Sequence, residues 1–290
     1  MSWHRLNRGL RCCACGKPDW CLVNDYATEF LCMRVQSRDE VLMKDGSTGY
    51  VHIADGAVVK PHRVTSLKVK DPPQVDFYPI WQKLVAENNS EWREALAKEL
   101  GVSYSSLVDL DSQWDARRQA WAFPMRDGRE NVVGIRLRFK DGSKKAVTGS
   151  KNGLFIPLMP NTIQNKRLWL FEGPTDTAAA LTLGLTAIGR PSCNAGMFDI
   201  VLFCNRRKPR EVVIVADSDT PGLEGAAALS RHLPVKNCTI TVPGKDMRGF
   251  LNDGGTARIL ESQVATTVWC LPACPENRNP ATYGTVRGGL

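Results

Sequence analysis

Two stretches of sequence decide the fold: residues 168–176 are LWLFEGPTD, and residues 212–222 are VVIVADSDTPG. Each begins with a short apolar run and passes at once into acidic residues and a glycine-containing turn. Apolar runs of this length predict strands that are buried on both faces. Residues 175–183 and 222–232, which follow them, predict helices. This alternation indicates an α/β fold with a parallel or mostly parallel sheet.

Acidic residues follow each predicted strand. Glu172 and Asp176 follow the first strand, Asp217 and Asp219 follow the second, and Asp246 follows a third predicted strand at 238–242. Ligands of such sheets bind beyond the carboxyl ends of the strands, where these acids are expected to meet. Mg²⁺ takes one or two carboxylates together with water and phosphate oxygens, so the combination predicts a divalent metal site. Taken alone, an Asp-x-Asp pair after a strand is more often a turn or a helix cap, and a Glu-Gly pair is common; the combination carries the prediction.

These motifs resemble the Toprim family over about residues 166–253. The forms that carry the resemblance are Glu172-Gly173-x-x-Asp176, Asp217-x-Asp219-x-x-Gly222 and Gly244-Lys245-Asp246, and they are most similar to the primase branch. The resemblance implies metal-dependent phosphoryl transfer with Mg²⁺ or Mn²⁺. It also implies that Glu172, Asp217 and Asp219 are the main metal ligands, and that Asp176 and Asp246 support them or bind a second ion.

The N-terminal cysteines predict a structural zinc site. Cys12-x2-Cys15-x5-Cys21-x10-Cys32 provides four thiolate ligands, which is the number that tetrahedral Zn²⁺ takes. Cys13 is a poor substitute for Cys12, because only one residue separates it from Cys15. His52 and His62 are alternative nitrogen ligands, although a surface or core histidine is the commoner state.

A zinc motif ahead of a Toprim core is the domain order of bacterial-type and phage DNA primases. The resemblance therefore implies a DNA-dependent RNA primase that polymerises ribonucleoside triphosphates on single-stranded DNA. The finger departs from the common Cys-His-Cys-Cys set of these proteins, since its second ligand would be Cys15, and it is more similar to phage or mobile-element relatives.

A basic stretch lies between the two motifs. The chain has a net charge of +8, and residues 115–151 hold ten Lys or Arg against four acids. Residues 121–125, 131–139 and 145–147 predict an antiparallel meander with Asp-Gly turns. Such a surface suits a polyanion, although a basic stretch is more often a solvated face. The residues expected to contact the template backbone and the triphosphate are Arg136, Arg138, Lys140, Lys144, Lys145 and Lys151.

Trp114 and Trp121 flank the first strand of this meander. They could stack on bases as exposed aromatic residues do in single-strand binders, but core positions are favoured. Residues 78–101 predict one helix with Gly101 as its C-cap, and residues 102–110 predict a second, shorter helix.

The chain is predicted to have three domains and a tail. These are a zinc-ribbon-like domain at 1–68, a basic α+β subdomain at 74–160, a Toprim α/β core at 161–260, and a partly disordered tail at 261–290. Asp71-Pro72-Pro73 predicts a linker. The fold class is therefore mixed, α+β and α/β.

No apolar run is long enough to span a bilayer, and no secretory signal is evident, so we expect a protein of the bacterial or infected-host cytoplasm without a membrane partner. In that compartment Cys193, Cys204 and Cys238 are expected to be buried thiols, and the Cys270-x3-Cys274 pair has no assigned role. The chain lacks a Walker-type phosphate-binding loop, so the expected replicative helicase would be a separate partner.

Two other function classes share parts of this pattern. A Toprim nuclease or ribosomal-RNA maturase would use the same carboxylates without needing the finger. A non-catalytic recombination mediator of the RecR type would combine zinc and Toprim elements in a DNA clamp, but it places its finger after helix-hairpin-helix elements, and the order here differs.

Overall fold

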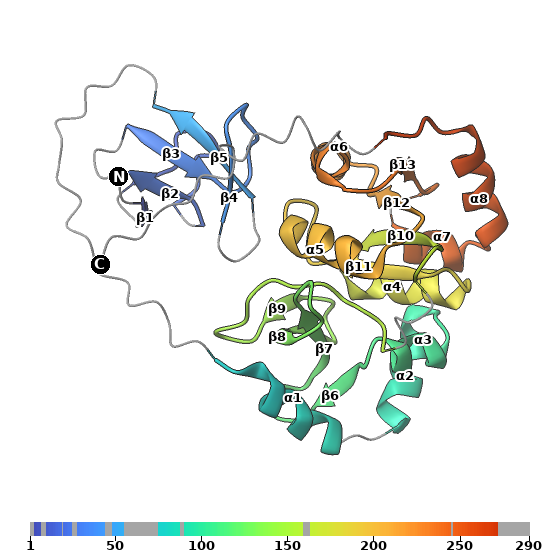
Figure 1. Cartoon of the computed structure of the whole chain (residues 1–290). Helices are drawn as coiled ribbons and strands as arrows, with labels where there is room; N and C mark the ends of the chain where they lie inside the picture. The colour runs from blue at the N-terminus through green and yellow to red at the C-terminus, as the bar shows by residue number, and fades with distance from the viewer. Residues whose placement is uncertain are drawn as a thin grey trace. The chain divides into compact units, whose positions relative to one another are not determined.

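The computed structural model describes residues 3–6, 10–18, 20–24, 28–43, 48–54, 75–87, 90–158, 163–244 and 246–271. They belong to two compact units, one within residues 1–73 and one within residues 74–278, and Figure 1 shows their elements. Several features named from the sequence lie outside the described residues. They are the linker at Asp71-Pro72-Pro73, His62, Lys245, and the part of the tail from residue 272 on, which includes Cys274. The predicted domain limits remain predictions. Among the described helices, none has the length and apolar character needed to cross a membrane.

The N-terminal unit is a small antiparallel sheet. Its strand order is β1 (Trp3–Arg5), β2 (Leu22–Asn24), β3 (Glu29–Cys32), β5 (Thr48–Ile53) and β4 (Glu40–Leu42). The sequence of residues 28–35 and 49–54 has a β-like pattern, and β3 and β5 overlap these stretches. Among the described residues, the apolar core of the unit holds Leu6, Val23 and Phe30 beside buried cysteines, and Leu31 and Tyr50 are buried as well. A core of this size rarely stabilises a domain without a metal or disulfides.

The first part of the larger unit is the predicted meander with helices around it. An antiparallel sheet runs in the order β6 (Gln113–Asp115), β7 (Ala120–Arg126), β8 (Val132–Phe139) and β9 (Lys144–Ala146). Helix α1 (Phe77–Ala86) packs Phe77, Trp81 and Leu84 against one face of β7 and β8.

The single helix predicted over 78–101 is wrong, because α1 ends at Ala86 and α2 (Ser90–Leu100) is a separate helix. The predicted C-cap is correct: Gly101 has a φ of +69°, and a Cβ on it would collide with the side chain of Asn252. The predicted short second helix is α3 (Tyr104–Asp109).

The second part of the larger unit is a parallel sheet, as predicted. Its order is β11 (Ala187–Arg190), β10 (Arg167–Glu172), β12 (Glu211–Ala216) and β13 (Asn237–Thr241), and every neighbouring pair is parallel. The three strands predicted in this region correspond to β10, β12 and β13. Strand β11 and helix α5 (Met197–Arg207) had no counterpart among the predicted elements.

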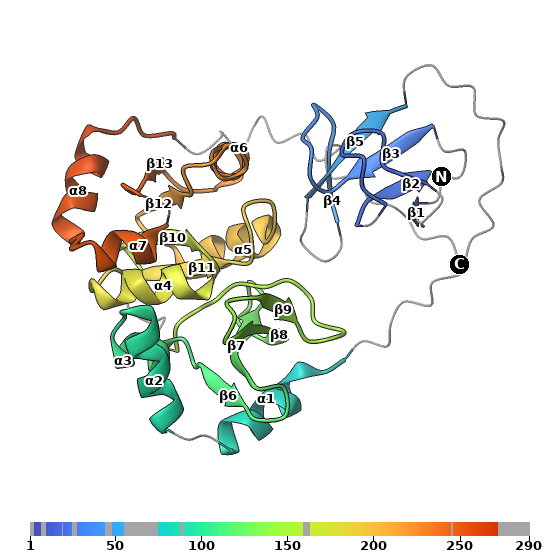
Figure 2. The ribbon, with the colours of Figure 1, turned by 180° about the vertical axis from the view of Figure 1, so that it is seen from behind.

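Alternate residues of each strand pack on opposite faces of this sheet. Trp169, Phe171 and Val213 pack with α4 (Gly173–Thr182), α7 (Met247–Asn252) and α8 (Ala257–Thr266). Leu168 and Ile214 pack with α5 and α6 (Thr220–His232). The sheet is therefore the middle of three layers, and α4 and α7 lie side by side in both views (Figures 1 and 2). The first core also includes Trp121 and Phe123 of β7, so it continues into the meander.

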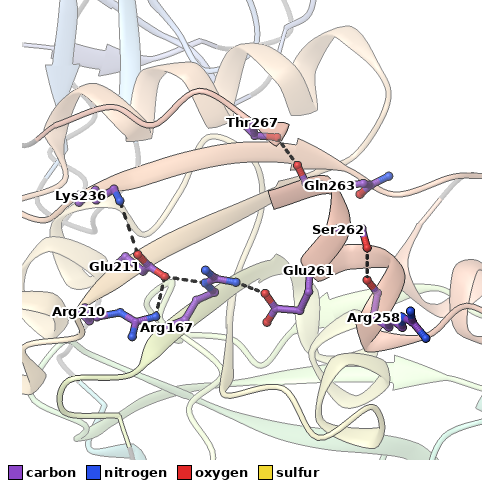
Figure 3. A network of polar contacts seen from close by, with 9 residues as sticks. All are labelled: Arg167, Arg210, Glu211, Lys236, Arg258, Glu261, Ser262, Gln263 and Thr267. Carbon is purple, nitrogen blue, oxygen red and sulfur yellow. Dashed lines mark hydrogen bonds and ion pairs between the residues drawn. The ribbon is translucent and has the colours of Figure 1, made fainter. Parts of the chain in front are cut away.

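An ion-pair network lies at the amino-terminal ends of the strands, here called the amino edge of the sheet (Figure 3). Glu211, the first residue of β12, accepts hydrogen bonds from Arg167 at 2.8 Å and Arg210 at 2.9 Å, and Lys236 lies 3.9 Å away. Arg167 also pairs with Glu261 on α8. Burial alone would raise the pKa of Glu211, but the two arginines outweigh it and lower that pKa. Glu211 thus has three basic partners.

We expect Ile214→Ala to lower the free energy of unfolding of the larger unit by about 2–5 kcal/mol, because Ile214 is fully buried in a central strand and its truncation leaves a cavity. Urea unfolding followed by near-UV circular dichroism measures this. The matched control is Ile259→Ala on the exposed side of α8, where a change of about 0.5 kcal/mol or less is expected. Equal effects of the two substitutions would contradict the burial pattern.

Candidate functional site

The carboxyl edge of the parallel sheet collects the predicted acids. The chain leaves β10 toward β11 on one side and later returns to β12 on the other side, so a topological switch point lies between β10 and β12. Crevices at such points are the usual ligand sites of open α/β sheets. Glu172 is the last residue of β10, and Asp217 follows β12 directly.

Glu172 is placed by the tight turn that follows it. Gly173 has a φ of +76°, a left-handed conformation that favours glycine, and it is also the first residue of α4. The strand therefore passes into the helix without a loop, which keeps the Glu172 carboxylate at the sheet edge. One of its oxygens, Oε2, is buried and has no hydrogen-bond partner among the described residues.

The other acids are held at helix starts. Asp219 caps α6 and accepts a hydrogen bond from the Gly222 N–H at 2.8 Å, and Asp246 caps α7 and accepts one from the Gly249 N–H at 2.7 Å. Asp176, in the first turn of α4, accepts from the Arg248 N–H at 3.1 Å. The cap interpretation of Asp219 is thus correct, and a cap leaves the second carboxylate oxygen available.

A cavity of about 460 Å³ opens at this edge. Four predicted acids line it, and Asp219 does not, although its charge acts on Glu172 and Asp217. Basic side chains form the rest of the polar wall. The charged lining residues are Glu172, Asp176, Asp217, Asp246, Arg136, Arg138, Lys144 and Arg248.

Crowding of like charges marks this edge. Burial raises the pKa of Glu172, and the charges of Asp217 and Asp219 add to the effect against the opposing charge of Arg190. Burial and then Asp219 and Asp246 raise the pKa of Asp217. Burial and the charge of Asp246 raise the pKa of Asp176 to about 7. Each shift means that the ionised form is disfavoured until a positive charge arrives.

The acids fit a hard divalent cation. Their ligand atoms do not converge as closely as those of the cysteine cluster, which is the one group of three or more such side chains found within 4.8 Å in the described part of the chain. Mg²⁺ does not need such a cage, because it keeps several waters and substrate oxygens. The unpartnered Glu172 oxygen and the all-oxygen donor set are the features that suit it.

The predicted basic residues divide into two groups. Arg136 and Arg138 on β8 and Lys144 on β9 line the cavity, and burial lowers the pKa of the Arg136 guanidinium. Lys140, Lys145 and Lys151 are exposed and do not line it. Half of the predicted set therefore faces the acids.

Trp92, Trp114 and Trp121 form one cluster of rings. Trp114 and Trp121 are buried, as favoured from the sequence. Trp92 of α2 stacks on Trp114 with ring centroids 4.6 Å apart and is 38% exposed. The Lys140 ammonium lies 5.9 Å from the Trp92 ring centre and 5.7 Å from that of Trp114. The exposed aromatic residue of the cluster is thus Trp92, which the sequence reasoning did not single out.

Two further charged residues were missed. Arg248 lines the cavity from α7, and Arg190, the last residue of β11, is buried next to Glu172 in the strand register. The signal for Arg248 was its position two residues after Asp246. Arg190 follows a run of three small or apolar residues, which ordinarily indicates only that a strand ends.

The four predicted cysteines converge in the N-terminal unit. The sulfur atoms of Cys12, Cys15, Cys21 and Cys32 all lie within 4.8 Å of one another. The Sγ atoms of Cys15 and Cys21 are 3.6 Å apart, close to the spacing of about 3.8 Å that tetrahedral Zn–S bonds produce. The donor set therefore fits structural Zn²⁺.

N–H groups surround these sulfurs. Cys32 Sγ accepts from the backbone N–H groups of Arg34 and Val35, and the Arg34 guanidinium donates to Cys15 and Cys21. Burial alone would raise the pKa of the Cys15 thiol, but hydrogen bonds from Lys17, Cys21 and Arg34 lower it to about 7. These bonds stabilise the thiolate of Cys15, the form that binds metal, whereas burial raises the pKa of Cys21 and Cys32.

Of the alternative ligands, Cys13 and His52 lie outside the cluster. Cys13 is exposed and is not part of it. A ring nitrogen of His52 lies 2.9 Å from the Val35 carbonyl oxygen. Cys204 and Cys238 are buried, as predicted. Cys193, which was also predicted to be buried, is only partly buried, and Cys270 is exposed.

We expect the chain to bind one zinc ion, and Cys32→Ser to lower the zinc content well below one per chain, because it removes one of four ligands. Inductively coupled plasma mass spectrometry after dialysis against a chelator measures it. Cys13→Ser is the matched control and should retain the wild-type content. Full zinc retention in Cys32→Ser would contradict the assignment.

Solved structures that the chain resembles include DNA primases. The chain aligns with the DnaG catalytic core at 14% identity over 67% of this chain and 80% of the other, with a TM-score of 0.53. The DnaG primase catalytic domain bound to single-stranded DNA aligns at 13% identity over 67% and 79%, with a TM-score of 0.53. The zinc-binding and RNA polymerase domains of the Aquifex aeolicus primase align at 14% identity over 90% and 79%, with a TM-score of 0.53.

This chain has the fold of a DNA primase. The likeness covers the zinc-ribbon-like unit as well as the α+β part and the parallel-sheet core, and it confirms the predicted fold class. At identities of 13–14% it shows the fold alone. No family model and no curated protein sequence matches the chain.

Proposed function

We propose that this protein is a DNA-dependent RNA primase that makes short RNA primers on single-stranded DNA. The observation that carries the proposal is the cavity of about 460 Å³, in which four carboxylates face four cations within a primase fold. Carboxylates alone would suit a metal, and cations alone would suit phosphate. A nucleoside triphosphate that is bound with a divalent cation requires both.

In this proposal the acids hold the metal and the cations hold the triphosphate. Glu172 and Asp217 are the main ligands, Asp219 contributes its remaining oxygen, and Asp176 and Asp246 support them. When bound, Mg²⁺ or Mn²⁺ supplies Lewis-acid stabilisation of the charge on the phosphate oxygens. Arg136, Arg138, Lys144 and Arg248 orient the phosphates. The 3′-hydroxyl oxygen of one nucleotide loses its proton to solvent and forms a bond to the α-phosphorus of the next nucleotide. The bond from that phosphorus to the α–β bridging oxygen breaks, and pyrophosphate leaves with the electron pair.

The template is proposed to follow strand β8. Residues 136, 138 and 140 are every second residue, so their side chains lie on the same face. Arg136 and Arg138 line the cavity, and Lys140 lies beside the stacked rings of Trp92 and Trp114. Cations in a row with an exposed aromatic ring at one end are what single-stranded binders use. The DnaG primase catalytic domain with bound single-stranded DNA has the same fold, which supports single-stranded DNA as the template of this chain.

The zinc unit and a helicase complete the proposed setting. The N-terminal unit with the four cysteines is proposed to help select the initiation site on the template, and the helicase is proposed to be a separate chain. The protein is proposed to act in the cytoplasm of a bacterium or an infected cell.

Asp217→Asn should lower primer synthesis by roughly 100-fold or more, because a metal ligand that stabilises transition-state charge by several kcal/mol is lost. The assay uses single-stranded DNA, labelled ribonucleotides and Mg²⁺ or Mn²⁺, with products resolved on a gel. Asp253→Asn, an exposed acid after α7, is the matched control and should leave synthesis unchanged.

The assay also separates the rival functions. If the wild type cleaves DNA and makes no RNA on many templates, the nuclease alternative replaces this proposal. If it only binds DNA, the non-catalytic alternative does.

Trp92→Ala should weaken binding of single-stranded DNA by roughly 5- to 150-fold, because stacking of one base on an aromatic ring contributes about 1–3 kcal/mol. Fluorescence anisotropy of a labelled oligonucleotide measures the affinity. Trp92→Phe keeps a stacking surface and should lose less, and Tyr78→Ala, an exposed aromatic of α1, should lose nothing. Unaltered binding by Trp92→Ala would exclude this template path.

A further inference from the structure

Arg190 is a buried cation behind the carboxylate edge. It ends β11 and is the register partner of Glu172 on β10, and its side chain is among the largest that are fully buried. Its Nη1 donates to the Cys193 carbonyl oxygen at 2.8 Å. Its Nε and Nη2 have no hydrogen-bond partner in the described part of the chain, and neither does Glu172 Oε2.

The free-energy cost of burying such a charged side chain must be offset by favourable interactions. A guanidinium remains charged under all ordinary conditions, and burying it with two unpaired N–H groups is costly. Nearby opposite charge is the compensation that the structure offers, since Glu172 and then Asp217 act on Arg190. Arg190 does not line the cavity, so it does not reach a bound substrate there.

Backbone groups of Cys193 act on both residues. Its carbonyl accepts a hydrogen bond from Arg190 at 2.8 Å, and its amide opposes the rise that burial causes in the pKa of Glu172. Helix α6 packs closely over the carbonyl, because a Cβ on Gly225 would lie 2.4 Å from the Cys193 oxygen. Arg190 therefore helps to hold the segment that follows β11, beside the end of β10.

We propose that Arg190 is a positioning residue with two effects on the carboxylate edge: it keeps the acids together before a cation binds, and it weakens the affinity of the edge for that cation. This inference rests on the proposed metal site. The first effect follows because the charge of Arg190 acts on both Glu172 and Asp217 and offsets part of the repulsion among the five acids. The second follows because a divalent ion would bind close to a fixed positive charge.

The test is a metal titration without nucleotide or DNA. Arg190→Met keeps the length and removes the charge, and Arg190→Lys keeps the charge and removes the fork of donors. Arg207→Met is the matched control, since Arg207 pairs with Glu130 at the far end of α5. The measurements are Mn²⁺ affinity by electron paramagnetic resonance and melting temperature with and without Mn²⁺.

Arg190→Met is expected to melt lower than the wild type without metal, to bind Mn²⁺ roughly ten-fold more tightly, and to gain more melting temperature from Mn²⁺. Arg190→Lys should bind Mn²⁺ with an affinity close to that of the wild type while melting lower without metal. Arg207→Met should show the wild-type Mn²⁺ affinity and the wild-type gain in melting temperature.

Mn²⁺ affinity of Arg190→Met equal to or weaker than that of the wild type overturns the inference. If the variant does not fold in metal-free buffer, recovery in Mn²⁺ supports it, and failure in both buffers overturns it. Failure of the proposed function would look different. Either Asp217→Asn would bind as much Mn²⁺ as the wild type, or the wild type would bind Mn²⁺ and make no primer.

Discussion

Repulsion among carboxylates at one edge of a parallel sheet is the constraint to which the rest of the larger unit responds. Parallel strands necessarily bring their carboxyl ends together, so acids that follow β10, β12 and β13 cannot avoid one another. The structure offsets the repulsion with cap N–H groups on Asp219 and Asp246, with Arg190 behind Glu172, and with cations across the cavity. These features compensate in part, since the pKa of Asp176 still rises to about 7 through burial and the charge of Asp246.

The two edges of the sheet divide stability from function. At the amino edge Glu211 has three basic neighbours, and its pKa falls despite its burial. At the carboxyl edge Glu172 keeps an unpartnered oxygen, and its pKa rises. One edge is therefore electrostatically complete, and the other remains in need of a cation. A sheet whose middle strands are buried on both faces can tolerate an incomplete edge, because packing holds the strands in place.

The acids could be predicted from the sequence because each follows an apolar run with its own strand signal. Strand β11 could not, since its four residues include Gly189 and end in an arginine, which gives no periodic pattern. Helix α5 starts after Gly196 in a left-handed conformation without a side-chain cap, so no start signal precedes it. The apolar spacing of α1 and α2 runs on across their junction, which hid the break. Burial of Arg190 depends on partners far away in sequence, and no local rule reports it.

Ligand chemistry also keeps the two predicted metals apart. Zinc binds most ligand sets more tightly than magnesium, so a thiolate at the carboxylate edge would favour the wrong ion. Cys193 lies close enough to Glu172 to feel its charge, but burial, followed by that charge, raises the pKa of its thiol to about 11. In the N-terminal unit, by contrast, N–H donors lower the pKa of Cys15 to about 7 against the effect of burial. Within the cysteine cluster the effect differs between residues, because burial raises the pKa of Cys21 and Cys32, so these two thiols need the positive charge of a metal ion to ionise. The two predicted sites therefore differ first in their ligand atoms, which are four sulfurs in one and carboxylate oxygens in the other.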